Sequence, residues 1–295
     1  MINRLCIIGV GLIGGSLSRA LRQAGVVKTV IGCSRNQQHL QRALELGVID
    51  EYTTTVSEAV RGADMIVISV PLGAMADIFA QIDSNIDADA VITDVGSAKA
   101  SVVDAVNAHL HKSKHQFVPG HPIAGTEQNG VDASFAELFQ GRRVILTPLE
   151  ENSPAAIERV KSMWESTGAE VQNMSLEHHD EVLAATSHLP HVLAFGLVDT
   201  LANLSDSDEI FQYAAGGFRD FSRIASSDPV MWRDICIENK DAILEIMDQY
   251  LADMELLREA MVDGNAAKLE RVFRRAKQAR DNYIKRQTNN KEQDN

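Results

Sequence analysis

Three segments in the middle of the chain combine histidine, serine or arginine with glycine or proline. They are Gly120-His121-Pro122-Ile123-Ala124-Gly125-Thr126-Glu127, Ser187-His188-Leu189-Pro190-His191 and Gly216-Gly217-Phe218-Arg219-Asp220-Phe221-Ser222-Arg223. A neutral imidazole, whose ordinary pKa is about 6.5, can accept a proton at neutral pH. An arginine guanidinium can hold a carboxylate through two parallel hydrogen bonds. These residue types therefore suit acid–base chemistry on a substrate that carries a carboxylate.

Each of these segments also has a purely structural interpretation. A His-Pro pair between glycines indicates a loop, where no apolar pattern demands a histidine, so we interpret His121 as catalytic rather than as a core residue. Pro190 breaks a helical pattern, which either shapes a site or makes an ordinary kink with surface histidines. The arginines of the third segment are either ligands of a carboxylate or solvated side chains.

A fourth segment, Thr93-Asp94-Val95-Gly96-Ser97-Ala98-Lys99, ends an apolar run that we interpret as a strand. Ligands of open α/β sheets bind outside the carboxyl ends of the strands. Ser97 is therefore expected at the edge of the sheet where a ligand would lie.

The elements expected to position these segments alternate between short apolar runs and helical patterns over residues 1–174. The continuous runs are typical of parallel strands that helices cover on both faces. This order predicts an N-terminal Rossmann-type, doubly wound parallel sheet. The apolar runs interpreted as strands are Leu5–Val10, Thr29–Cys33, Met65–Val70, Ala90–Val95, Arg143–Thr147 and Ala169–Met174.

The turn after the first strand matches the pattern G-x-G-x-x-G and opens a predicted helix. Gly9 permits the tight turn, Gly11 lets the backbone approach a pyrophosphate, and Gly14 lets the helix pack closely on the sheet. The N–H groups of the helix start, which includes Leu12 and Ile13, then bind the diphosphate of a dinucleotide.

The second strand ends in Cys33-Ser34-Arg35-Asn36, without the acidic residue that commonly holds the ribose hydroxyls of NAD. Ser34 can donate a hydrogen bond to a 2′-phosphate and Arg35 can donate charged ones. NADP is therefore predicted to be preferred over NAD. The alternative is that Arg35 stacks on the adenine or lies in solvent.

Residues 175–286 are predicted to form an all-α helical domain. After Pro229, apolar residues recur at helical spacing from Trp232 to Met261, which predicts one helix of roughly 30 residues and about 45 Å. Because a small domain does not need so long a helix, we expect this domain to form a homodimer. Residues 287–295 are polar, lack apolar periodicity and are expected to be disordered.

The composition indicates which classes of binding partner and which cellular compartment to expect. The formal net charge of −13 disfavours nucleic-acid binding. The three cysteines are far apart and predict neither a disulfide framework nor a metal site. No signal peptide is expected, and the most apolar stretch, Leu189–Leu201, is shorter than the ~20 residues that span a membrane. A cytoplasmic protein without a membrane partner is expected.

Taken together, these segments resemble the prephenate/arogenate (cyclohexadienyl) dehydrogenase family. The resemblance extends from Leu5 to about Lys240, and it implies a Rossmann domain followed by a helical dimerisation domain in an enzyme of tyrosine biosynthesis. In the implied reaction, hydride leaves C4 of a cyclohexadiene ring for NAD(P)⁺, the C4 hydroxyl loses its proton, and the ring carboxylate departs as CO₂. The product is 4-hydroxyphenylpyruvate from prephenate or tyrosine from arogenate. The motifs are G-V-G-L-I-G-G, D-V-G-S-A-K, G-H-P-I-A-G-T-E, S-H-L-P-H and G-G-F-R-D-F-S-R, followed by D-P-V-M-W-R-D-I.

The resemblance also implies roles for single residues. His121 would accept the proton of the C4 hydroxyl, and Ser97 would hydrogen-bond the same hydroxyl and help to orient His121. Arg223 would bind a substrate carboxylate, whereas no role is transferred to Arg219, where family members can carry lysine. Three further residues would line, gate or tune the pocket: Ser187, His191 and Glu127.

Two other functions stay open on the sequence. A β-hydroxyacid-type dehydrogenase would use a lysine of the helical domain, for which Lys240 is the candidate, but it would leave two of the histidine motifs without a purpose. A non-catalytic NADP(H)-binding redox sensor would not need two histidines and an arginine on the nicotinamide side. No residue distinguishes prephenate from arogenate as the substrate.

Overall fold

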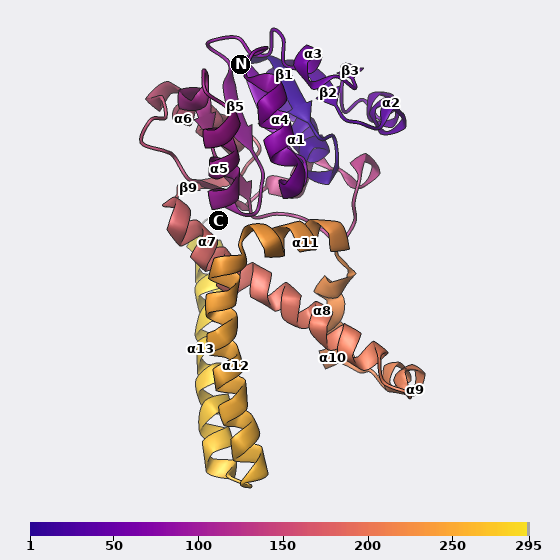
Figure 1. Cartoon of the computed structure of the whole chain (residues 1–295), viewed down its shortest axis with the longest axis vertical. Helices are drawn as coiled ribbons and strands as arrows, with labels where there is room; N and C mark the ends of the chain where they lie inside the picture. Colours follow the sequence, from indigo (N-terminus) through magenta and orange to yellow (C-terminus); the bar gives the residue numbers. More distant parts are fainter. Residues whose placement is uncertain (294–295) are drawn as a thin grey trace. The chain divides into compact units, whose positions relative to one another are not determined.

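The computed structural model describes residues 1–293, and the side chains of residues 1–286. It begins with a six-stranded sheet in the order β3-β2-β1-β4-β5-β6, in which every pairing is parallel (Figure 1). This is the order of a doubly wound dinucleotide-binding sheet, so the predicted fold class is confirmed. The strands are β1 (Ile2–Ile8), β2 (Val27–Cys33), β3 (Glu51–Thr53), β4 (Met65–Ile68), β5 (Val91–Asp94) and β6 (Phe117–Val118).

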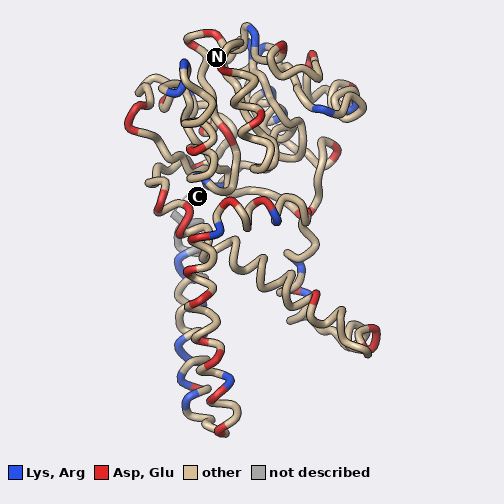
Figure 2. Tube along the Cα trace, viewed as in Figure 1, with Lys and Arg blue, Asp and Glu red and all other residues tan. Residues whose placement is uncertain are grey.

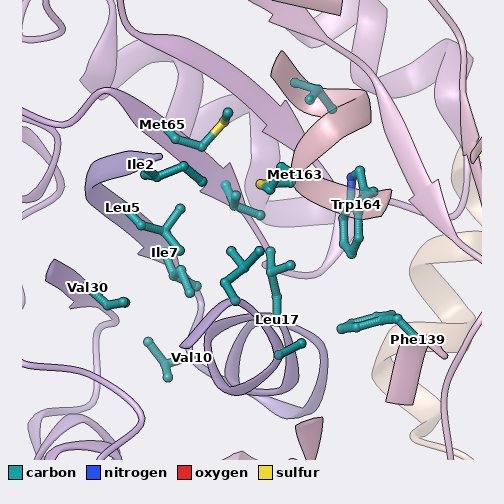
Figure 3. Packing of buried hydrophobic residues seen from close by; sticks show 14 of the residues in the cluster. Ile2, Leu5, Ile7, Val10, Leu17, Val30, Met65, Phe139, Met163 and Trp164 are labelled. Carbon is teal, nitrogen blue, oxygen red and sulfur yellow. The ribbon is translucent and has the colours of Figure 1, made fainter. Parts of the chain in front are cut away.

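Helices cover both faces of this sheet. They are α1 (Leu12–Gln23), α2 (Gln37–Glu45), α3 (Val56–Ala59), α4 (Met75–Ile82), α5 (Lys99–His109) and α6 (Pro154–Glu165), with short turns η1 (Leu72–Ala74), η2 (Lys114–Gln116), η3 (Val131–Ala133) and η4 (Ala136–Phe139). Successive strand residues point to opposite faces, so Leu5 of β1 packs in one hydrophobic cluster and Cys6 in the other. Figure 3 shows the first cluster, in which Leu17 of α1 and Trp164 of α6 lie among strand residues.

A second sheet of three strands carries the first histidine motif. Its strands are β7 (Gly120–Pro122), β8 (Arg143–Leu146) and β9 (Glu170–Asn173), with β7 antiparallel to β8 and β8 parallel to β9. The loop expected at His121 is therefore wrong, because Gly120–Pro122 form a short buried strand. Three residues are too few to show a strand period, and Pro122 is tolerated because β7 lies at the edge of the sheet.

The chain then becomes helical, as predicted. Helix α7 (Leu176–Leu183) continues through a π-helical turn, η5 (Ala184–His188), into α8 (Leu189–Ala202). The break expected at Pro190 is therefore wrong. The wider turn comes just before a proline that cannot donate a backbone hydrogen bond, so the helix continues without a break. The next elements are α9 (Ser207–Gln212), α10 (Gly216–Ser222), η6 (Arg223–Ser226) and α11 (Pro229–Glu238).

The single long helix expected after Pro229 is also wrong, because α11 ends before Asn239 and α12 (Lys240–Val262) begins after it. Asn239 is buried, and its side-chain amide donates to the carbonyl oxygen of Asp180 at 2.9 Å and contacts Nδ1 of His188 at 3.0 Å. The backbone keeps helical hydrogen bonds on both sides of Asn239, whose N–H donates to Ile235 and whose carbonyl oxygen accepts from Ile243.

Residues 1–243 form one compact unit and residues 244–295 a second. The second consists of the rest of α12 and of α13 (Ala266–Gln293), with Gly264 at a φ of +61° between the two helices. Helix α13 passes residue 287, where a disordered tail is expected to begin. No glycine or proline follows Gly264 to end the helix. The last two residues of that expected tail lie outside the described residues.

One helical run in the described part of the chain, Leu176–Ala202, is long and apolar enough by length and composition to cross a membrane. Figure 2 shows few charged residues along α8 and many along α12 and α13. Nevertheless, His179, Asp180 and His188 of this run are buried and hydrogen-bonded to other elements of the first unit. These buried hydrogen bonds are those of a helix packed within the folded domain.

Candidate functional site

The glycine turn between β1 and α1 leaves no room for side chains at two positions. Gly9 has a φ of +96°, and a Cβ atom there would lie 2.1 Å from the carbonyl oxygen of Ser69. A Cβ atom on Gly14 would lie 2.5 Å from the carbonyl oxygen of Gly9. A Cβ atom on Gly11, by contrast, would meet no described atom within 4 Å, so a ligand has space to approach this backbone.

The turn borders a cleft of about 790 Å³ at the carboxyl ends of β1, β2 and β4. Of the residues predicted to bind a cofactor, Gly9, Gly11, Ser34 and Arg35 line this cleft. An open cleft beside a glycine turn fits a dinucleotide.

The other three predicted cofactor residues, Leu12, Ile13 and Gly14, are not among the lining residues. The side chains of Leu12 and Ile13 pack against the hydrophobic core. These three residues form the first turn of α1, whose first backbone hydrogen bond runs from Gly15 to Gly11. Their N–H groups therefore have no partner within the helix and are available to a ligand.

Basic side chains gather in the cleft beyond the end of β2. Arg35 is joined there by His39 and Arg42 of α2. A guanidinium nitrogen of Arg42 lies 2.8 Å from a carboxylate oxygen of Asp132 in η3, which also lines the cleft. Arg42 and Asp132 were not identified from the sequence, because 90 positions separate them and only the fold brings them together.

A buried ion pair fixes the loop that contains Ser97. Lys99 and Asp94 have fully buried side chains that pair with each other. Lys99 Nζ also donates to the carbonyl oxygen of Gly120 at 2.8 Å, and Asp94 accepts from the N–H of Gly120 at 3.1 Å and of Gly96 at 2.7 Å. Burial lowers the pKa of Lys99, although Asp94 opposes this shift. The pair ties the end of β5, just before the loop of Ser97, to β7, which carries His121.

His121 is 8 % exposed, and its partner is another histidine. Its Nδ1 lies 2.9 Å from Nε2 of His179, whose Nδ1 lies 2.7 Å from a carboxylate oxygen of Asp180. Asp180 also accepts the backbone N–H groups of Lys99 and Ala100, each at 2.8 Å. Burial lowers the pKa of His121 well below its ordinary value, and His179, Lys99 and His188 add to the effect. His121 is therefore neutral at physiological pH.

His179 and Asp180 were not identified from the sequence. They lie in Glu177-His178-His179-Asp180-Glu181, a polar stretch that is typical of a solvated helix face. His179 is nevertheless fully buried. The orienting partner expected for His121 was Ser97, whereas the structure records His179 as its hydrogen-bond partner.

The S-H-L-P-H segment packs its two histidines around Trp232 of α11. The ring of His191 stacks on Trp232 with a centroid distance of 3.6 Å and an interplanar angle of 17°. Nδ1 of His191 lies 2.9 Å from the carbonyl oxygen of Ser187, and burial lowers the pKa of His191. Burial lowers the pKa of His188 to about 4. Both imidazoles are thus neutral, and Ser187 is half-buried beside them.

Arg223 begins η6 and forms an ion pair with Glu127, which follows β7. The structure therefore brings together two residues that the sequence assigned to the substrate pocket. Arg219 and Lys240 are both exposed. An exposed Lys240 does not fit the buried catalytic lysine that a β-hydroxyacid-type reaction would need.

Comparison with known proteins agrees with this geometry. Residues 17–173 match the family model described as prephenate dehydrogenase, nucleotide-binding domain, and residues 175–275 match prephenate dehydrogenase, dimerization domain. The cyclohexadienyl dehydrogenase of Zymomonas mobilis is 40 % identical over 280 residues, covering 94 % of this chain and 95 % of the relative. The prephenate dehydrogenase of Bacillus subtilis is 37 % identical over 289 residues, covering 97 % of this chain and 78 % of the relative.

Solved structures are similar over nearly the whole chain. The crystal structure of prephenate dehydrogenase from Aquifex aeolicus with hydroxyphenyl propionate and NAD⁺ has a TM-score of 0.88 and 37 % identity, covering 95 % of this chain and 98 % of that one. Synechocystis arogenate dehydrogenase has a TM-score of 0.78 and 27 % identity, covering 95 % and 99 %. This chain therefore belongs to the prephenate dehydrogenase family, and it is an oxidoreductase with a nicotinamide-nucleotide-binding domain.

Proposed function

We propose that this protein catalyses the oxidative decarboxylation of prephenate or arogenate in tyrosine biosynthesis. The observation that carries the proposal is a buried, neutral His121 whose Nδ1 is bound to His179, on a strand next to the loop of Ser97. The names of the relatives supply both candidate substrates, because they include prephenate, cyclohexadienyl and arogenate dehydrogenases.

The cofactor would be held by the glycine turn, the N–H groups at the start of α1, and Ser34 and Arg35. A nicotinamide held there would supply the acceptor for the substrate's hydride. Residues of the chain accept the substrate's proton and bind its carboxylates. His121 accepts the proton of the substrate's C4 hydroxyl, assisted by Ser97. A base with a low pKa is sufficient, because the hydroxyl becomes strongly acidic as electrons leave the carbon that bears it.

The substrate's carboxylates need a cationic partner within an acidic protein. Arg223 fills this role through its guanidinium, which in this structure is paired with Glu127. A substrate carboxylate would replace Glu127, which gives Glu127 a gating role. Ser187 and His191 line the helical side, where a neutral His191 offers Nε2 as an acceptor because its Nδ1–H is committed to the carbonyl oxygen of Ser187.

Among the nicotinamide cofactors, we propose a preference for NADP over NAD. Support comes from Ser34 and Arg35 at the end of β2, from Arg42 beside them, and from the absence of an acidic residue in Cys33-Ser34-Arg35-Asn36. The Aquifex relative was solved with NAD⁺, so use of NAD by this chain is also expected.

The working unit is proposed to be a homodimer through the helical domain, with the domain boundary at residues 174–175. The matched family model is named for dimerization, and several large apolar side chains of the helical region are exposed in a single chain. Light scattering tests this proposal, since a mass equal to the single-chain 32.3 kDa would refute it. These apolar side chains include Leu197, Leu204, Phe211, Tyr213, Phe221, Ile237, Leu244, Leu251, Met254, Leu256, Met261 and Val262.

A cytoplasmic location is proposed because the three cysteines are free thiols and Cys6 and Cys33 are buried.

A steady-state assay tests the proposed activity. Folded protein is mixed with prephenate or arogenate and with NAD⁺ or NADP⁺, in the four possible combinations, and reduced nicotinamide is followed by absorbance. Turnover in any combination supports the proposal, and the most efficient combination identifies the substrate and the cofactor. No turnover in all four, from protein that still binds a dinucleotide, would refute it.

A further inference from the structure

We propose that Asp180 and His179 are positioning residues that set the tautomer of His121, so that its Nε2 carries the lone pair that meets the substrate hydroxyl. The inference rests on the proposed function. It starts from a continuous set of buried hydrogen bonds that runs from the first residues of α5 through Asp180 and His179 to His121.

The inferred bond directions start from the carboxylate of Asp180. A carboxylate is only an acceptor, and Asp180 is held ionised: burial disfavours its charge, but the hydrogen bonds from His179, Lys99 and Ala100 outweigh burial and lower its pKa. Nδ1 of His179 must therefore carry a hydrogen and donate it. With Nδ1 as the donor to Asp180, we infer that Nε2 of His179 is the acceptor in the bond to His121.

The same reasoning continues to the next ring. Nδ1 of His121 faces an acceptor at 2.9 Å and must donate to it. The remaining nitrogen, Nε2, then has the free lone pair of the neutral ring. Nε2 has no hydrogen-bond partner among the described residues. Without His179, either nitrogen of His121 could hold the hydrogen, and part of the protein would present a donor to the substrate.

The geometry of this chain of bonds is held at both ends. Asp180 binds the backbone N–H groups of Lys99 and Ala100 at the start of α5, while the side chain of Lys99 binds Asp94 and the carbonyl oxygen of Gly120. Gly120 is the residue before His121, so His121 is fixed through its backbone on one side and its ring on the other. The negative charge of Asp180 also stabilises His121 when it gains the substrate's proton.

The test compares substitutions of His179 that keep or remove the acceptor. In His179→Gln, the amide oxygen can take the place of Nε2 and accept from His121, whereas His179→Leu offers no acceptor. We expect kcat to fall about 100-fold or more in His179→Leu, relative to the unsubstituted protein. The kcat of His179→Gln should be at least about tenfold higher than that of His179→Leu. KM for the substrate and the affinity for NADP⁺ should change by less than about threefold in both variants. Neither substitution removes a side chain that is proposed to contact the substrate or the dinucleotide.

The matched control is His178→Gln, on the same helix at an exposed position. Its kcat should stay within about twofold of the unsubstituted protein. Equal losses in His179→Gln and His179→Leu, with equal melting temperatures, would show a packing role and overturn the inference.

A second measurement does not depend on turnover. Selectively ¹⁵N-histidine-labelled protein, saturated with NADP⁺, reports which ring nitrogen of His121 is protonated, with its resonances identified by their loss in His121→Gln. We expect a proton on Nδ1 in the unsubstituted protein and loss of this single tautomer in His179→Leu. A proton on Nε2 in the unsubstituted protein would overturn the inference. If no substrate is turned over, the proposed function fails, and this measurement still decides the tautomer.

Discussion

Arg223 and Glu127 form an ion pair between η6 of the helical region and the segment that follows β7 of the second sheet. The side chain of Arg223 is 64 % exposed and that of Glu127 is 36 % exposed, so the pair is accessible to an anion from solvent. A carboxylate that arrives at Arg223 competes with Glu127 for the same guanidinium.

Replacement of Arg223 by alanine removes the cation that binds the substrate. We expect KM for the substrate to rise by about 10- to 100-fold with little change in kcat, because a charge-assisted hydrogen bond contributes about 1.5–3 kcal/mol. Steady-state kinetics measure both constants. Arg219→Ala, at an exposed position without an assigned role, is the control and should behave as the unsubstituted protein. A fallen kcat with an unchanged KM would show that the assignment of Arg223 is wrong.

Replacement of Glu127 by glutamine removes the competing charge and keeps the shape. KM for the substrate is expected to decrease by about two- to tenfold, since Arg223 no longer exchanges one carboxylate for another. The same assay measures it. An unchanged KM would mean that Glu127 does not limit access to Arg223.

Replacement of Arg35 by alanine tests the proposed 2′-phosphate site. KM for NADP⁺ should rise by about 10- to 100-fold, while KM for NAD⁺ should change by less than about threefold, because NAD⁺ lacks the phosphate. Equal effects on both cofactors would place Arg35 against a part of the dinucleotide that the two share.

The low pKa of His121 sets the acidic side of the pH profile. Burial is the largest cause of the shift, and His179, Lys99 and His188 lower the pKa further. A base is active when unprotonated, so activity is lost only as pH falls through the lowered pKa. We expect the acidic limb of kcat/KM to have its midpoint below pH 6.5. A midpoint at or above 6.5 would show that the active-site imidazole is not held in this environment.

Because of His188, the free energy of unfolding is also expected to decrease as pH falls. Its pKa is about 4 in the folded protein and 6.5 as the ordinary value. Between these values the unfolded chain binds more protons than the folded one, so the free energy of unfolding falls as pH falls from 6.5 to 4. Urea unfolding at pH 7 and pH 5 measures the difference, which should be smaller in His188→Gln. The same difference in both proteins would contradict the assignment of this pH dependence to His188.

The longer strands and the glycine turn after β1 could be predicted from the sequence. Continuous apolar runs predicted four strands of the Rossmann sheet, β1, β2, β4 and β5, and the glycine spacing placed the turn between β1 and α1, because both signals are local. The runs at Arg143–Thr147 and Ala169–Met174 were assigned to the wrong sheet, because strand partners cannot be identified from a local apolar run. Strands β3, β6 and β7 were missed because two or three residues carry no readable period. The break at Asn239 was missed because it is one residue long and helical hydrogen bonds continue on both sides of it.

The sequence singles out candidate site residues but not the buried residues that hydrogen-bond to them. His121, Arg223 and Glu127 lie in motifs with unusual glycine and proline content, which attract attention without a structure. Asp180 and His179 look like members of a solvated helix. Their partners Lys99 and His121 are 81 and 58 positions away, so only the packing of α7 against α5 and β7 identifies them.

The most direct test of His121 as the acceptor of the substrate's proton is to measure turnover and dinucleotide binding on one preparation of His121→Asn. We predict that kcat falls by at least about 100-fold, while the affinity for the dinucleotide stays within about twofold. Such a result separates the proton-accepting group from the cofactor cleft. Near-normal turnover in this variant would contradict the account, because no other residue could then be assigned the role of base from this structure.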